Sequence, residues 1–320
     1  MKRGASMRKQ LFLILCFSLF SGASAQTVST PRGLVIRPQV ISIQLGARGH
    51  IFIPIQVNNS EPLWFVLDSG SSSTVLNKRL VGKLKLKVEA AGEAEGGGGA
   101  EEAVLTSGVT LNLSGISLTD QQVPAIDFKG LEASLGRNID GLLGYDFIRL
   151  LVVEVDYEAG VVRTYNAATY RYRGRGESLP ITTDDGHPHV RLKVTVLGRE
   201  PIEGKFIVDG GAGGTTLEFA EHFVKTHKLL DTVQLLDTAS LAAIGGKVNI
   251  SYGRGKSIQL GRLLLENPIV GFSQTKREAR TRRNIAGLIG AKLLRRFTVI
   301  YDDRRRRIIF EPNSSFARPE

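Results

Sequence analysis

Two stretches of the chain share one pattern, in which three apolar residues run into an aspartate and a glycine-bearing turn follows at once. The first stretch spans Phe65 to Leu76 and the second spans Phe206 to Leu217. Aligned on Asp68 and Asp209, they place Phe, Asp, Gly, Thr and Leu at identical offsets, 141 residues apart (209 minus 68). Each stretch predicts a buried strand that delivers one carboxylate to a tight loop. We therefore expect the two aspartates to meet in the fold as a catalytic pair.

Other parts of the chain repeat in the same order. Gly141-Leu142-Leu143-Gly144 is mirrored 146 residues later by Gly287-Leu288-Ile289-Gly290. Alternating apolar residues predict half-buried strands at 51–57 and again at 190–196. The 36 glycines fit the many tight turns of an all-β protein. A two-copy repeat of strands favours two similar β lobes that face each other, with the site in the cleft between them.

The chain divides into a leader, two lobes and a linker. Basic residues precede a short apolar run at 11–20, and Ala23-Ser24-Ala25 fits a cleavage site, so residues 1–25 are predicted to be a signal peptide. The alternative is an uncleaved membrane anchor. We assign residues 40–166 to an N-terminal β lobe, the polar segment 167–186 to a linker, and residues 187–312 to a C-terminal β lobe.

The use of cysteine agrees with export. The single cysteine, Cys16, lies inside the leader, so the mature chain has no disulfide. An exported protein without disulfides is compatible with a bacterial periplasm. We expect a periplasmic or secreted monomer that meets a membrane only through its leader, before cleavage.

The paired aspartates suggest a chemistry. Two carboxyl groups held about 3 Å apart cannot both ionise easily, so they share one proton. The ionised member can take a proton from a water molecule while the protonated member donates to a carbonyl oxygen. Such a pair can hydrolyse a peptide bond without a metal, a cofactor or a covalent intermediate. A lone Asp-Ser-Gly is more often an ordinary turn, and only its repetition in a matching frame favours the catalytic interpretation.

These residues resemble the aspartic proteases of the pepsin and retropepsin clan. Asp68-Ser69-Gly70-Ser71-Ser72 is similar to the D-[ST]-G-[SA] signature, and the two Gly-bounded elements resemble the segment beneath each catalytic loop. The short lobes are closer to bacterial retropepsin-like proteins than to pepsins. The resemblance implies an all-β, bilobal aspartic-protease-like fold, with two pseudo-symmetric β-barrel lobes and short helices. It also implies an exported aspartic endopeptidase with Asp68 and Asp209 as its dyad and an extended polypeptide as its substrate.

The resemblance also assigns supporting roles in the two loops. Ser69 would brace the loops through hydrogen bonds, Ser71 would support Asp68, and Gly70 and Gly211 would let backbone amides approach the carboxylates. Gly210 departs from the family, which places Thr or Ser there, so one bracing hydroxyl is missing. This departure leaves open an alternative, a catalytically silent homologue that binds peptides in the same cleft.

Two glycine clusters are candidates for flaps over the site. Gly96, Gly97, Gly98 and Gly99 lie between strand-like segments, which predicts the tip of a long hairpin. Gly245 and Gly246 lie in a second predicted hairpin and resemble a retroviral-type flap. The alternative for residues 86–107 is a plain surface loop.

Other functions have weaker support. The net charge of +11 falls to +7 (11 minus 4) without the leader's basic residues, and a basic surface alone does not require nucleic acid as a partner. We expect no nucleic-acid partner and interpret the basic clusters as solvated surface. His187 and His189 form an H-x-H pair with no third ligand at a useful spacing, so we expect no metal site. The basic clusters are Lys276, Arg277, Arg280, Arg282, Arg283 and Arg304 to Arg307.

Overall fold

The computed structural model describes residues 38–319, apart from 114, 184 and 277–283. The leader predicted at 1–25 and the part of the basic cluster from Arg277 to Arg283 lie outside the described residues. Strands make up most of the rest and form three sheets, as expected of an all-β chain. No helix in the described part combines the length and the apolar character needed to cross a bilayer.

The first eight-stranded sheet comes entirely from the N-terminal half of the chain. Its strand order is β2-β3-β4-β9-β5-β8-β7-β6, with β3 also pairing with β7. Its strands are β2 (Gln44–Leu45), β3 (Ile51–Val57), β4 (Leu63–Leu67), β5 (Val75–Asn77), β6 (Lys87–Glu95), β7 (Ala100–Leu113), β8 (Ile116–Ile126) and β9 (Gly141–Leu143).

The second eight-stranded sheet reproduces this order with strands of the C-terminal half. Its path is β13-β14-β20-β15-β19-β17-β16, with β18 beside β17 and an additional β13–β17 pairing. Its strands are β13 (His189–Val196), β14 (Ile202–Asp209), β15 (Leu217–Phe219), β16 (Leu235–Ala243), β17 (Gly246–Leu260), β18 (Leu263–Glu266), β19 (Ile269–Ser273) and β20 (Gly287–Gly290).

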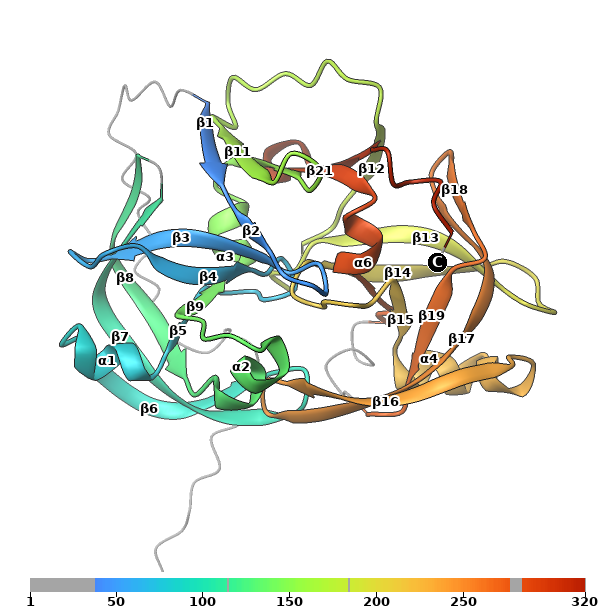
Figure 1. Cartoon of the computed structure of the whole chain (residues 1–320), viewed down its shortest axis with the longest axis horizontal. Coiled ribbons are helices and arrows are strands. Elements are labelled where there is room, and N and C mark those ends of the chain that lie inside the picture. Colours follow the sequence, from blue (N-terminus) through green and yellow to red (C-terminus); the bar gives the residue numbers. More distant parts are fainter. Residues whose placement is uncertain (1–37, 114, 184, 277–283, 320) are drawn as a thin grey trace, which may run out of the picture.

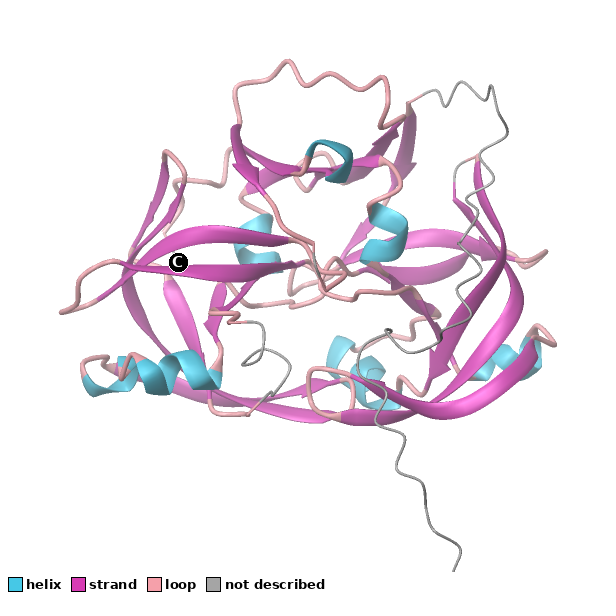
Figure 2. Cartoon of the chain, turned by 180° about the vertical axis from the view of Figure 1, so that it is seen from behind, coloured by secondary structure: helices cyan, strands magenta, loops and turns pink. Residues whose placement is uncertain are grey.

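Strand directions also match between these two sheets. The aspartate strands β4 and β14 run parallel to β9 and β20, respectively, and β5 and β15 run antiparallel to the same two strands. The repeat recognised in the sequence therefore extends to strand order and direction. Figures 1 and 2 show the two halves side by side, with similar outlines seen from front and back.

The third sheet has six strands and is built from both halves. Its order is β1-β11-β10-β21-β22-β12, and β10 pairs with β21 across the two halves, so that Val153 lies opposite Tyr301. Figure 1 shows this sheet at the top, above the junction of the halves. Its strands are β1 (Gln39–Ser42), β10 (Val152–Asp156), β11 (Val161–Tyr165), β12 (Glu177–Pro180), β21 (Phe297–Asp302) and β22 (Arg307–Pro312).

Strand β12 lies inside the segment 167–186 that was expected to be a linker. It pairs with β22 and buries Leu179, so part of this connection belongs to the third sheet. The polar composition around it hid a four-residue strand with one inward-facing apolar side chain.

The helices are short, as predicted. Helices α3 and α6 begin directly after the Gly-bounded strands β9 and β20, at equivalent places in the two halves. The helices are α1 (Arg79–Lys83), α2 (Lys129–Leu135), α3 (Tyr145–Ile148), α4 (Glu221–Thr226) and α6 (Ala291–Leu294), with 3-10 turns η1 (Leu229–Asp231) and η2 (Asp303–Arg305).

Apolar and polar residues alternate along the strands, and the apolar side chains form the core. In β13, for example, Val190, Leu192, Val194 and Val196 are buried while Arg191 and Lys193 between them are exposed. The inward side chains of all three sheets join one large hydrophobic cluster that continues from one half to the other. This shared core holds the two aspartate strands in a fixed relation.

Candidate active site

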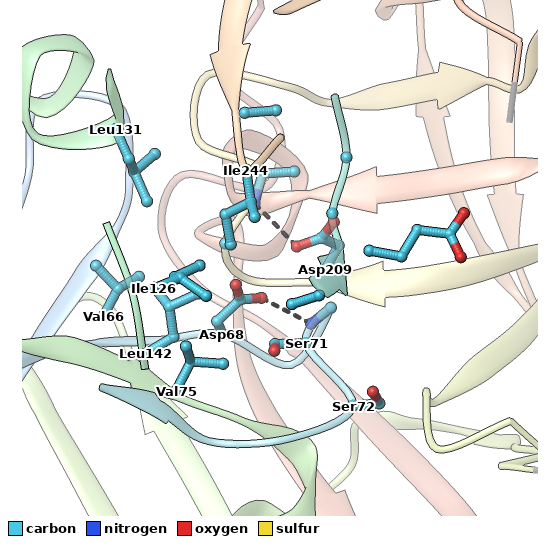
Figure 3. A pocket seen from close by; sticks show the side chains of 18 of the residues that line it. Val66, Asp68, Ser71, Ser72, Val75, Ile126, Leu131, Leu142, Asp209 and Ile244 are labelled. Atoms are coloured by element: carbon cyan, nitrogen blue, oxygen red, sulfur yellow. Dashed lines mark hydrogen bonds between the residues drawn. The ribbon is translucent and has the colours of Figure 1, made fainter. Parts of the chain in front are cut away.

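The two aspartates lie next to each other where their strands end. Asp68 directly follows β4, and its N–H donates to Leu143 O of the neighbouring parallel strand at 2.9 Å. Asp209 is the last residue of β14 and lies in register with Gly290 of β20. The strand-end aspartates thus meet from equivalent positions in the two halves, and Figure 3 shows them facing one cavity.

Glycine makes this approach possible. A Cβ on Gly70 would lie 2.2 Å from Asp209 Cγ, and a Cβ on Gly211 would lie 2.4 Å from Asp68 Cγ. Real side chains essentially never come so close, so each loop packs the backbone of its glycine against the carboxyl group of the other loop.

Backbone amides and burial set the electrostatics of the pair. Gly70 N donates to Asp68 Oδ1 at 2.9 Å, and Ala212 N donates to Asp209 Oδ1 at 3.0 Å. Burial and the neighbouring Asp209 carboxyl, to which Asp68 is hydrogen-bonded, raise the pKa of Asp68 to about 8, against the opposing effect of the Gly70 and Ser71 amides. Two such carboxyl groups titrate together and hold one proton between them over a wide pH range.

The raised pKa predicts a pH-dependent gain of stability on replacing Asp68 by Asn. Since folding lifts the pKa above its ordinary 3.8, the stability that proton binding contributes is complete below about pH 4 and is lost as pH rises toward 8. Asn does not titrate, so Asp68→Asn should unfold at a higher urea concentration than the wild type at pH 8 and show no such advantage at pH 4.

The matched control for this measurement is Asp120→Asn. Asp120 is exposed and has a left-handed backbone that Asn also tolerates. Its stability difference from the wild type is measured at the same two pH values and subtracted from that of Asp68→Asn. An equal effect of Asp68→Asn at pH 4 and pH 8 would contradict a proton-sharing pair.

Comparison with known proteins agrees with this geometry for the first half. Residues 53–147 match the family model for aspartyl proteases. The matched segment contains Asp68, its loop, and the Gly141 to Gly144 element beside it. A search of curated proteins found no match for the chain. The family match supports a protease hydrolase in general terms, and the internal repeat carries the pattern into the second half.

Ser69 links the two loops. Its Oγ donates to Val208 O at 2.9 Å and accepts from Gly210 N at 3.0 Å. Gly210 has no hydroxyl to return this contact. Ser71 supports the ionised form of Asp68 through its backbone amide, while its hydroxyl donates to Ser73 O at 2.7 Å.

Apolar side chains line the cavity on both sides of the aspartates. The cavity has a volume of about 1060 Å³. Those on the Asp68 side, seen in Figure 3, are Val66, Val75, Ile126, Leu131 and Leu142. Those on the Asp209 side include Ile207, Ile285 and Leu288. No sequence pattern indicated that Ile126 and Leu131 belong to the site, because they follow local strand and helix patterns and reach it only through the fold.

Both glycine clusters proposed as flaps lie at hairpin tips, and the two tips meet. Gly98 N at the β6–β7 tip donates to Ile244 O at the β16–β17 tip, at 2.7 Å. Gly99 and Gly245 also touch through their backbones. Both hairpins border the same cavity as the aspartates, and Figure 1 shows them converging below the junction of the halves.

This contact predicts an effect of Gly98→Ala on substrate binding. A Cβ at Gly98 would lie 2.5 Å from the Gly246 carbonyl carbon, so the tips must separate. We expect KM for a peptide substrate to rise several-fold while kcat changes less. Gly82→Ala, in a helix with no atom within 4 Å of the new Cβ, is the matched control. An unchanged KM in Gly98→Ala would exclude the tips from substrate binding.

Two histidines, His50 and His187, also line the cavity. They lie at related positions, just before β3 and just before β13, and reasoning from sequence gave neither a role in the site. The His50 ring lies against Gly213 and hydrogen-bonds the Gly211 backbone, and burial lowers the pKa of His50.

Asp185 forms close contacts with two histidines, at 3.4 Å from His187 Nδ1 and 3.3 Å from His189 Nε2. Burial raises the pKa of Asp185, but these histidines outweigh that effect and hold it far below its usual range. Over the described ranges, no group of three or more His, Cys, Asp or Glu has metal-site geometry.

The basic hairpin tip at Arg304 to Arg307 is partly used within the fold. Arg305 Nη1 lies 3.1 Å from Asp302 Oδ1, and Arg307 Nε lies 2.9 Å from Asp302 Oδ2. Asp302 is fully buried, so these two arginines compensate an internal charge.

Proposed function

We propose that the chain is an exported, retropepsin-like aspartic endopeptidase with two β-barrel lobes, in which Asp68 and Asp209 activate the water that hydrolyses a peptide bond. The observation that carries the proposal is the contact between two half-buried carboxyl groups that come from equivalent strands and face one cavity. The match of the first half to aspartyl proteases agrees with it.

The reaction needs only the shared proton and one water molecule. The ionised carboxylate takes a proton from water as the water oxygen forms a bond to the carbonyl carbon, and the protonated carboxyl donates to the carbonyl oxygen. The resulting tetrahedral diol has no formal charge. It collapses when a hydroxyl proton returns to one carboxylate, the other carboxyl protonates the amide nitrogen, and the C–N bond breaks. The pair again holds one proton at the end of the cycle.

The cavity favours a polypeptide with bulky apolar side chains beside the bond that is cut. The apolar group around Asp68 and the smaller one around Asp209 would each take one such side chain. The β6–β7 and β16–β17 tips would cover the extended chain. We propose a monomer that needs no metal or cofactor and acts in the periplasm or outside the cell.

Digestion of an unbiased peptide mixture by the mature protein, with products identified by mass spectrometry, tests this proposal. We expect internal cleavage between acidic and neutral pH, with apolar residues enriched beside the cut. A peptide with a hydroxymethylene group in place of the scissile amide should inhibit, because it resembles the tetrahedral diol. The absence of cleavage across this pH range would reject the endopeptidase.

A catalytically silent peptide-binding homologue remains the second candidate, because Gly210 lacks the hydroxyl expected in the second loop. It predicts that the hydroxymethylene peptide and the corresponding ordinary peptide bind equally well, and that neither is cut. Calorimetric titration with both peptides, run beside the digest, separates the two candidates.

A further inference from the structure

The hydrogen bonds around Ser69 include one from outside the two aspartate loops. Tyr301, in β21 of the third sheet, places its hydroxyl 3.1 Å from Ser69 Oγ. The only hydroxyl proton of Ser69 is committed to Val208 O, and its oxygen already accepts Gly210 N–H. Tyr301 must therefore donate, and its O–H fills the second acceptor site of the Ser69 oxygen.

Tyr301 also breaks the symmetry between the halves. The offset of 146 residues that relates Gly141 to Gly287 also relates Val155 to Tyr301, and Asp156 to Asp302. The second half therefore has a phenol where the first half has a valine. In the aspartate loops the difference is reversed. The first half has the hydroxyl, on Ser69, and the equivalent residue of the second half, Gly210, has none.

These two departures compensate each other. An ideal Cβ on Gly210 would lie 3.2 Å from Leu67 O and 3.5 Å from Ser69 Oγ, so a hydroxyl at residue 210 would enter this same cluster of hydrogen bonds. From this arrangement we infer that Tyr301 is a positioning residue, whose hydroxyl braces the two aspartate loops in place of the side-chain hydroxyl missing at Gly210. This inference rests on the proposed function for its meaning in catalysis.

The environment of Tyr301 suits a fixed donor. Its side chain is almost completely buried and does not border the cavity, so it touches no substrate. Burial raises the pKa of its hydroxyl far above the ordinary value, and the nearby Asp209 and Asp68 carboxyl groups add to this effect. The hydroxyl therefore keeps its proton at every pH at which a peptidase of this kind would work.

The test is Tyr301→Phe, which removes only the hydroxyl. We expect kcat for peptide cleavage to fall by about tenfold with KM unchanged within a factor of about two, because the loops lose a brace and the substrate loses no contact. The matched control is Tyr145→Phe, which removes another buried tyrosine hydroxyl, bonded to Asp303 Oδ1 at 3.2 Å. This control should keep its kcat. A kcat for Tyr301→Phe equal to that of Tyr145→Phe would overturn the inference.

Rescue by Gly210→Ser distinguishes positioning from a general structural role. The backbone of Gly210 is outside the left-handed region, so serine fits its conformation. In the Gly210→Ser background, Tyr301→Phe should lower kcat by less than about threefold. If kcat falls as much in this background as in the wild-type background, the Tyr301 hydroxyl does not replace a hydroxyl at residue 210, and the inference is overturned. If Tyr301→Phe alone does not fold, this background supplies the comparison.

Failure of the inference and failure of the proposed function give different results. If the wild type cuts peptides and Tyr301→Phe cuts them equally well, only the inference fails. If the wild type cuts nothing, the inference can still be tested by urea unfolding. The wild type, the two single variants and the double variant are then compared. The loss of stability caused by Tyr301→Phe should then be smaller in the Gly210→Ser background, and equal losses in both backgrounds would overturn the inference.

Discussion

Replacing Asp68 by Asn should lower kcat for peptide cleavage by about 10²–10⁴-fold. Asn keeps the shape of the side chain and can accept the Gly70 N–H, but it can neither take a proton from water nor return one to the substrate. Because the pair shares one proton, losing either carboxyl removes both the acid and the base. The measurement is steady-state cleavage of a single peptide selected from the digest, followed between about pH 4 and pH 9.

The pH profile of the wild type is part of this prediction. The raised pKa of Asp68 means that the shared proton is lost only near pH 8, so kcat/KM should fall on the alkaline side near that value. The control is Asp120→Asn, which should follow the wild-type curve. Undiminished cleavage by Asp68→Asn would reject the dyad, whatever the shape of the profile.

Gly70→Ala should nearly abolish activity although it replaces no titratable group. The new methyl group would lie 2.2 Å from Asp209 Cγ, so the second carboxyl must move away from the first. A displacement of about 1 Å at a reacting centre can cost about a hundredfold in rate, and such overpacking typically destabilises by about 1–3 kcal/mol. We expect both effects, measured as kcat and as the midpoint of urea unfolding.

The mirrored variant and a control sharpen the Gly70 prediction. Gly211→Ala places its methyl group 2.4 Å from Asp68 Cγ and should reproduce the loss from the other half. Gly130→Ala, in helix α2 with no atom within 4 Å of the added Cβ, should retain activity. Normal cleavage by either loop variant would mean that the loops do not need the close packing seen here.

The elements that sequence reasoning found are those repeated within the chain. The aspartate strands and the Gly-bounded strands recur at nearly constant offsets, so one copy supports the interpretation of the other. The hairpin tips were also recognisable, because glycine clusters flanked by strand-like segments are local signals. Their contact with each other was not, since no local pattern encodes where two distant tips meet.

The features that sequence reasoning missed depend on long-range contacts. Tyr301 lies 232 residues from Ser69, the serine that it contacts. In the sequence it is one of several large residues of a buried strand, and no local pattern indicates its contact. Helix α2 brings Leu131 into the cavity, yet its sequence resembles a surface helix. Strand β12 was hidden in a polar segment because a single inward side chain, Leu179, is too short a pattern to detect.

Both copies of the repeat lie in one polypeptide, and β10 of the first pairs with β21 of the second. A mutation therefore changes one copy and leaves the other unchanged. An assembly of two identical subunits would receive every substitution twice, so a glycine at one loop would delete both hydroxyls at once. Joining the copies removes that restriction. Val155 and Tyr301 are one such pair of equivalent positions at which the two copies carry different residues.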